Sequence, residues 1–187
     1  QAFRLKKPDF ASEALLAFIY DQIHCYAYEE NSWVKKTQVS VRELYTNHDS
    51  LLLSDVPLWV GGRLDGCLTV ASMPGKSITI YRDVFAGAGD DMALGLISGA
   101  DFIIADSDSI RARNSLTLAA ALCAPYGRLV VENLGDSPGG WHKGTRLPLI
   151  RIGSLYLHEN SILSLQDGTG FYESTIRTDK RFKNNRC

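Results

Sequence analysis

A glycine-rich segment follows a short β-rich run, and its residue types are suited to binding a cofactor. Gly87 and Gly89 end the sequence Asp83-Val84-Phe85-Ala86-Gly87-Ala88-Gly89. Because glycine has no Cβ, its backbone can approach a ligand closely and adopt dihedral angles that other residues avoid. The sequence therefore predicts a cofactor contact at Gly87 and Gly89, and the alternative is a purely structural turn between a strand and a helix.

Two carboxylates after this turn bear on which cofactor it would hold. Asp90 and Asp91 stand at the start of a helix predicted over residues 91–98. A helix N-terminus attracts anions, but two carboxylates placed there repel a pyrophosphate. They suit a ligand with a cationic centre such as a sulfonium, so the charge pattern favours S-adenosylmethionine over a dinucleotide.

A further acid follows the next apolar run, Phe102–Ala105. Asp106 lies 23 residues after Asp83, near the spacing of about 20 at which Rossmann-type sites place a carboxylate on ribose hydroxyls. Asp106 is therefore the first candidate for a ribose contact, and Asp108 is the second. The alternatives are a solvated loop acid or a helix cap at Asp106, and a helix cap at Asp108.

The elements that would position these residues alternate between strand and helix. The predicted order is strand 77–81, helix 91–98, strand 102–105, helix 110–124 and strand 128–131. Such alternation is typical of parallel α/β units, and wholly apolar strands suit a sheet that is covered on both faces. We predict an α/β fold with a Rossmann-like, mostly parallel sheet and helices on both faces.

The start of the chain has the spacing of an amphipathic helix. Apolar residues recur three and four positions apart over residues 12–28, and Ser12 stands as an N-cap. Residues 31–74 carry short apolar runs broken by glycine and proline, and they indicate no definite element. We therefore predict a helical and irregular N-terminal layer over residues 1–74 and a Rossmann-like core over residues 75–187.

The turn and the acids resemble the first two motifs of class I S-adenosylmethionine-dependent methyltransferases, with FkbM-like and DNA-methylating members nearest. The resemblance lies in Asp83–Gly89, Ala93–Leu96 and Phe102–Asp108. It implies a cofactor at the carboxyl ends of the first strands. The residues implied to hold S-adenosylmethionine are Asp83, Phe85, Gly87 and Gly89 around its methionine end and Asp106 on its ribose.

Two later residues are candidates for catalysis. The segment Ile162–Phe171 is similar to a late motif of FkbM-like O-methyltransferases, which implies that Asp167 is an active-site acid, although the lysine that precedes the acid in that family is absent. A plain Asp-Gly turn at Asp167 is the alternative. His142, beside Trp141 in a glycine-rich loop, is a candidate general base or substrate contact, and the alternative is an exposed loop residue.

These features predict a methyltransferase that acts on an oxygen or nitrogen acceptor. Residues 91–109 also resemble the donor lobe of fucosyltransferases, so a glycosyltransferase donor-binding lobe is one alternative. The other alternative is a methyltransferase-like module without catalytic activity that serves binding or assembly.

Composition sets broad limits on partners and location. The 187 residues are 45% hydrophobic and 22% charged, and the formal net charge of -1 argues against a surface that coats nucleic acid or anionic membrane as a whole. The basic tail over residues 177–187 is a candidate contact for a nucleic-acid backbone. The four cysteines lack metal-ligand spacing, and no apolar run is long enough to cross a bilayer. We expect no metal, no membrane partner and a cytoplasmic protein.

Overall fold

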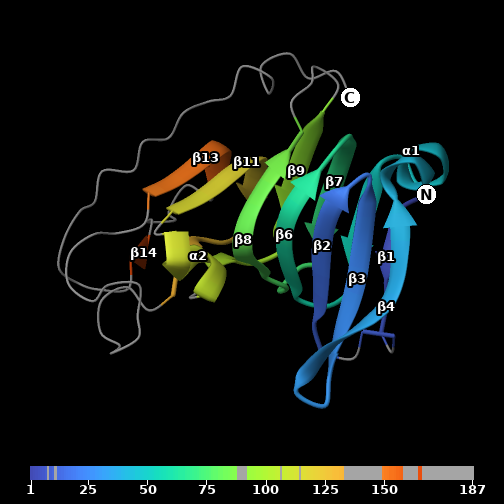
Figure 1. Ribbon diagram of the computed structural model, residues 1–187, viewed down its shortest axis with the longest axis horizontal. Helices are drawn as coiled ribbons and strands as arrows, with labels where there is room; N and C mark the ends of the chain where they lie inside the picture. Colours follow the sequence, from blue (N-terminus) through green and yellow to red (C-terminus); the bar gives the residue numbers. More distant parts are fainter. Residues whose placement is uncertain are drawn as a thin grey trace.

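The computed structural model describes residues 1–7, 9–10, 12–87, 92–105, 107–113, 115–132, 149–157 and 164–165, and this part of the chain is mostly β-strand (Figure 1). The strands are β1 (Phe3–Leu5), β2 (Ala14–Tyr20), β3 (Gln22–Glu29), β4 (Ser32–Ser40), β5 (Leu51–Ser54), β6 (Leu58–Leu64), β7 (Cys67–Ser72), β8 (Ile78–Ala86), β9 (Ala93–Ile97), β10 (Phe102–Ile104), β11 (Ser115–Ala124), β12 (Leu129–Val131), β13 (Leu149–Leu157) and β14 (Ser164–Leu165). The helices of the described part are α1 (Val41–Asn47) and α2 (Asp108–Arg113).

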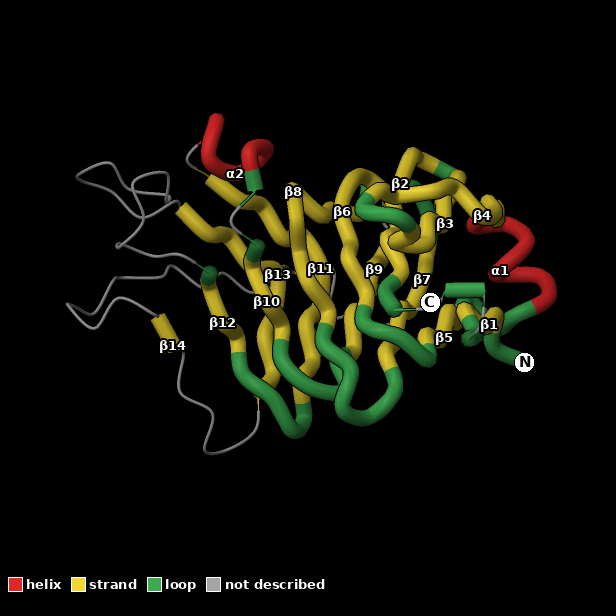
Figure 2. Tube along the Cα trace, turned by 90° about the horizontal axis from the view of Figure 1, so that it is seen from below, coloured by secondary structure: helices red, strands yellow, loops and turns green. Residues whose placement is uncertain are grey.

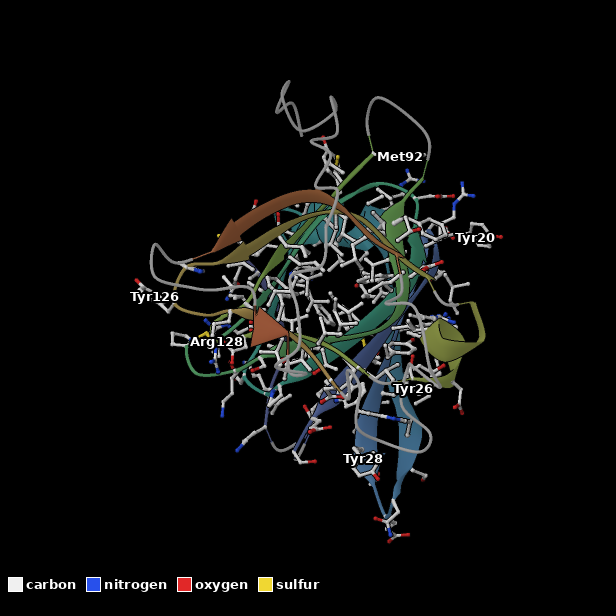
Figure 3. All side chains as sticks on the ribbon, turned by 90° about the vertical axis from the view of Figure 1, so that its left-hand side faces the viewer. Tyr20, Tyr26, Tyr28, Met92, Tyr126 and Arg128 are labelled. Atoms are coloured by element: carbon white, nitrogen blue, oxygen red, sulfur yellow. The ribbon has the colours of Figure 1, made fainter. Side chains whose placement is uncertain are left out.

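The strands wind as successive turns of a coil, because each strand other than β3 and β4 pairs in parallel with a strand of a neighbouring turn. One series runs from β2 through β6, β8 and β10 to β12, and another runs from β5 through β7, β9 and β11 to β13. Figure 2 shows these turns side by side, and Figure 3 looks along them into an interior filled with side chains. Parallel pairing between successive turns is the arrangement of a parallel β-helix, in which each turn packs against its neighbours.

The interior consists of apolar side chains stacked in register from one turn to the next. One column contains Leu16, Val60, Ile80, Ile104 and Val131, each at most 1% exposed. Successive side chains of a strand point to opposite faces, so alternate residues of β2, β6, β8, β10 and β12 face this core. Burial of one column against the next holds the turns together.

A second column shows the same stacking. It contains Ala14, Leu58, Ile78, Phe102 and Leu129, which are 0–2% exposed. The β-branched and aromatic residues of these columns fit the pleated, half-buried surface of a strand.

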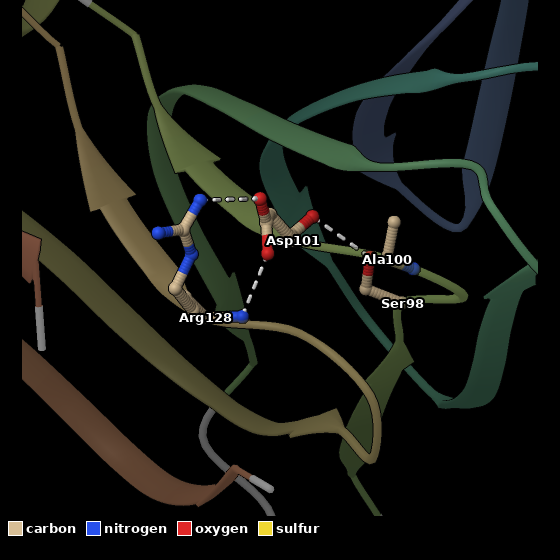
Figure 4. A network of polar contacts seen from close by, with 4 residues as sticks. All are labelled: Ser98, Ala100, Asp101 and Arg128. Atoms are coloured by element: carbon tan, nitrogen blue, oxygen red, sulfur yellow. Dashed lines mark hydrogen bonds and ion pairs between the residues drawn. The ribbon is translucent and has the colours of Figure 1, made fainter. Parts of the chain in front are cut away.

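The corner between β9 and β10 joins one turn to the next through polar contacts (Figure 4). The buried hydroxyl of Ser98 donates to the carbonyl oxygen of Asp101 at 2.8 Å. The Asp101 carboxylate accepts from the backbone N–H of Arg128 at 2.8 Å and lies 3.7 Å from its guanidinium. These bonds satisfy backbone groups that a tight loop would otherwise leave without partners.

A hairpin leaves the coil between its first two turns. β3 pairs antiparallel with β2 and with β4, and α1 follows with Ser40 as its N-cap, whose hydroxyl accepts from the backbone N–H of Glu43 at 3.0 Å. Val41 and Leu44 of α1 are buried. The helix then leads into β5, where the coil resumes.

The predicted α/β fold with helices on both faces is wrong, and so is the helical N-terminus. Residues 12–28 form the strands β2 and β3, in which Ala14, Leu16 and Phe18 are buried from one strand and Ile23 and Cys25 from the other. In each strand the buried residues therefore alternate with more exposed ones, which is the period of two of a β-strand. The spacing of three and four that predicted a helix combines apolar residues from two adjacent strands.

The two core helices were also predicted wrongly. Residues 93–97 form β9, with Leu94 and Leu96 buried, and the segment 110–124 divides into the end of α2 and the long strand β11. The predicted strands 77–81, 102–105 and 128–131 correspond to the start of β8, to β10 and to β12. Across residue 75 the coil continues, since β6 pairs with β8 and β7 with β9. No helix in the described residues is long and apolar enough to span a membrane.

Candidate functional site

The described residues of the predicted cofactor site lie along β8 and at the start of α2. Asp83 lies within β8, and its Oδ1 accepts a hydrogen bond of 2.9 Å from the backbone N–H of Thr117 in β11. Phe85 is half-buried on the same strand, and Asp108 is the exposed first residue of α2. The element that follows β8 in the described part is β9, not a helix, so the predicted strand–helix turn is not formed there.

Gly87 has a packing reason to be glycine. A Cβ at this position would overlap the Asp65 carboxylate and the Met92 sulfur. The backbone N–H of Gly87 also donates to the carbonyl oxygen of Leu64 at 2.7 Å, which continues the ladder between neighbouring turns. The space beside Gly87 is therefore filled by the protein itself.

Four other predicted site residues lie outside the described residues. They are Gly89, Asp106, His142 and Asp167. Their roles in binding S-adenosylmethionine or in catalysis stay predictions.

The structure brings together a different set of residues on the outer side of the coil. We define the aromatic face as the outward side chains of Tyr26 and Tyr28 on β3, Trp33 on β4, Trp59 on β6 and Tyr81 on β8. In the strand register, Leu15 of β2 stands between Tyr26 and Trp59. These side chains belong to neighbouring strands although up to 55 residues separate them in sequence.

Three rings of the aromatic face touch in a series. The ring centroids of Tyr28 and Trp33 lie 5.1 Å apart, and those of Trp33 and Trp59 lie 6.1 Å apart, both in edge-to-face geometry. Such pairs are favourable because the positive edge of one ring meets the negative face of the other. The indole Nε1 of Trp59 donates to Glu13 at 2.9 Å, which fixes the orientation of that ring.

Next to these rings, buried small residues lie beneath the outward side chains. Ala17 of β2 is in register with Gly61 of β6. A Cβ at Gly61 would lie 2.5 Å from Cγ of Arg82 and 2.9 Å from Cε1 of Tyr81. The side chains of Tyr81 and Arg82 therefore lie directly across the Gly61 backbone, and glycine is what allows this contact.

Charged and polar groups accompany the rings. The Arg82 guanidinium lies 5.2 Å from the centroid of the Tyr81 ring, and its Nε is buried with no hydrogen-bond partner in the described part of the chain. Burial raises the pKa of Tyr81, the nearby Arg82 lowers it, and Tyr26 raises it further. Lys35 Nζ donates to Gln38 Oε1 at 2.7 Å, and the His24 and Tyr26 rings lie 6.5 Å apart.

The aromatic face was not predicted from the sequence, because β3 lies in the segment predicted as a helix and β6 in the segment with no definite element. The available signal was a period of two in His24, Tyr26 and Tyr28, which alternate with the buried residues Ile23, Cys25 and Ala27. Trp33 could not be placed beside Trp59 without knowledge of the strand pairing. No cluster of potential metal ligands occurs among the residues that the structure describes.

The fold and the site together define a parallel β-helix with an aromatic and hydrogen-bonding outer face. Comparison with protein-family models, with curated proteins and with solved structures finds no match.

Proposed function

We propose that this protein binds an extended carbohydrate chain on the aromatic face. The observation that carries the proposal is the series of ring contacts from Tyr28 through Trp33 to Trp59 across β3, β4 and β6. Sugar rings present flat patches of C–H groups that pack on aromatic rings, and aromatic side chains combine a large apolar body with a polar group. A row of rings offers successive sugars of one chain repeated contacts of the same kind.

Side chains on the same side of the sheet supply hydrogen bonds for sugar hydroxyls. His24 and Gln38 stand opposite each other in the β3–β4 register, and Lys35 is paired with Tyr26. A hydroxyl both donates and accepts, so it pairs with imidazole, amide and ammonium groups alike. The aromatic face thus combines stacking with polar recognition.

A carbohydrate suits this surface better than a nucleic acid does. Proteins that bind single-stranded nucleic acid also stack bases on aromatic rings, but they add a continuous positive groove for the phosphates. Here the positive Lys35 and Arg82 are accompanied by Glu13 and Asp83, and the whole chain has a net charge of -1. The face therefore lacks the continuous positive groove that a nucleic acid requires, and a carbohydrate chain is the better match.

The scaffold holds the rings in place before a ligand arrives. The backbones of β2, β3 and β6 are paired along their lengths, and Trp59 is tied to Glu13. A preorganised surface loses less conformational entropy on binding, which improves affinity.

Affinity electrophoresis in gels that contain soluble polysaccharides tests the proposal. We expect the protein to be retarded by at least one of xylan, mannan, hydroxyethyl cellulose and polygalacturonate, and Trp59→Ala to weaken retardation strongly. Tyr126→Ala is the matched control, since Tyr126 is 81% exposed but lies on another side of the coil (Figure 3). Retardation by none of the four polymers, or an equal loss with both variants, would contradict the proposal.

The methyltransferase hypothesis stays a separate prediction that rests on the sequence resemblance. A cytoplasmic location and a nucleic-acid contact of the basic tail also stay predictions from the sequence. Calorimetry with S-adenosylmethionine, comparing the intact protein with Asp106→Ala, tests the methyltransferase hypothesis. Binding that the substitution abolishes would support a methyltransferase, and its absence would remove this candidate.

A further inference from the structure

Arg82 is a half-buried arginine without a carboxylate partner among the described residues. Arg4, Arg63 and Arg128 each lie within 4.0 Å of an aspartate oxygen. Arg82 makes no ion pair with a described residue, although it is half-buried against Tyr81 and the Gly61 backbone. A partly desolvated guanidinium without an anion is electrostatically incomplete.

The surroundings of Arg82 fix its direction. A Cβ at Gly61 would lie 2.5 Å from the Arg82 Cγ, and one at Gly62 would lie 3.1 Å from its Nη2, so the side chain lies flat along β6. The Tyr81 ring flanks the guanidinium at 5.2 Å. Nε is buried, which leaves the terminal nitrogens of the half-buried side chain to meet a ligand.

We propose that Arg82 binds the carboxylate of a uronic acid, so that the carbohydrate taken by the aromatic face is an acidic polysaccharide. This inference rests on the proposed function and narrows its ligand class. A guanidinium is planar and presents parallel N–H donors that match the two oxygens of a carboxylate. The sugar that carries the carboxylate would then lie beside Tyr81, next to the rings that contact the rest of the chain.

The two nearby acids each accept a hydrogen bond from another group. Glu13 accepts from the Trp59 indole, and Asp83 accepts from the Thr117 backbone N–H. Lys35 is hydrogen-bonded to the uncharged Gln38 and adds positive charge on the same side of the sheet.

The test compares polygalacturonate with its fully methyl-esterified form, because esterification removes the charge and keeps the sugar chain. We expect the wild-type protein to bind the acid form roughly tenfold more tightly than the ester, as one charge-assisted contact predicts. Arg82→Gln should abolish this preference while binding of the ester persists. Arg82→Lys, which keeps the charge but not the planar fork, should retain part of the preference.

Arg63→Gln is the matched control, since Arg63 is already paired with Asp65 at 2.8 Å. This substitution should leave the preference for the acid form unchanged. The preference of the wild-type protein should also fall as salt is raised, which checks the inference without any substitution. Equal binding of acid and ester, or a preference that survives Arg82→Gln, would overturn it. If xylan or mannan is bound but neither form of polygalacturonate is, the uronate inference fails and the proposed function stands; if no polymer is bound, both fail.

Discussion

The carboxylate of Glu13 accepts a hydrogen bond of 2.9 Å from the indole Nε1 of Trp59, although 46 residues separate them in the chain. Glu13 directly precedes β2, and Trp59 lies on β6, the next parallel strand. The bond orients the indole that ends the ring series of the aromatic face.

Glu13→Ala should weaken carbohydrate binding, but less than Trp59→Ala does. Loss of the acceptor frees the Trp59 ring without removing it, whereas Trp59→Ala removes a whole aromatic contact and should cost about 2 kcal/mol, roughly thirtyfold in Kd. Affinity electrophoresis of both variants against the same polymer measures the order. A Glu13→Ala loss larger than that of Trp59→Ala would show that Glu13 itself, and not the ring, makes the main contact.

Two glycines should respond in opposite ways to alanine. A Cβ at Gly99 would overlap the carbonyl oxygen of Met73, whereas one at Gly95 finds ordinary contact with Thr69 Oγ1 at 3.5 Å. Gly99→Ala should therefore cost about 2 kcal/mol or more through overpacking. Gly95→Ala should be neutral or slightly stabilising, because alanine loses less backbone entropy in a strand. Urea unfolding monitored by circular dichroism compares them, and equal destabilisation would contradict the stacking of turns at the Gly99 corner.

Because Phe102 lies in an interior column, its truncation should strongly lower the stability of the protein. This side chain is 0% exposed in the column with Leu58, Ile78 and Leu129, so Phe102→Ala should lower the free energy of unfolding by about 3–5 kcal/mol. Ile97→Ala is the control, since Ile97 is 38% exposed and should cost about 1 kcal/mol or less. Similar losses in both variants would mean that the coil interior is not packed as described.

The buried Cys25 predicts a specific loss of stability at alkaline pH. Burial raises the pKa of its thiol from 9.0 to about 12, with a smaller opposing effect of Lys35. Below pH 9 the thiol is protonated in both the folded and the unfolded protein and contributes no pH dependence. Above pH 9 the thiol of the unfolded protein ionises, whereas that of the folded protein stays protonated. The free energy of unfolding therefore falls until the pH reaches the pKa of the folded protein. Between these values the wild-type protein should lose about 1.4 kcal/mol per pH unit relative to Cys25→Ala.

Urea unfolding of the two proteins at several pH values from 8 to 10.5 gives this difference, and other titrating groups cancel in the comparison. A constant difference across that range would show that the thiol is not shielded in the folded state.

Short, wholly apolar strands were recognisable from the sequence, but their assembly was not. β10 and β12 match the predicted runs because Phe102–Ile104 and Leu129–Val131 are apolar and bounded by loop residues. The β-helix was hidden because its turns differ in length. Leu58, Ile78, Phe102 and Leu129 occupy one column but are separated by 20, 24 and 27 residues, so no fixed repeat marks them.

The candidate site shows the same dependence on register. Gly61 lies in the segment 31–74, for which the sequence indicated no definite element, and only the pairing of β6 with β2 and β8 reveals that it makes room for Tyr81 and Arg82. Glycine occurs in this chain both in loops and inside strands. A glycine after an apolar run therefore fits the strand–helix turn of an α/β fold as well as the corner of a β-helix.

Tryptophan fluorescence during titration with an oligosaccharide tests the central claim most directly. In a Trp141→Phe background the remaining tryptophans are Trp33 and Trp59, both on the aromatic face. We predict that oligogalacturonate produces a saturable change in emission, and that in Arg82→Gln the same change requires a roughly tenfold higher concentration of the acid form, similar to that of its methyl ester. Oligosaccharide binding detected by calorimetry with no change in the emission of Trp33 and Trp59 would place the ligand elsewhere and contradict the account.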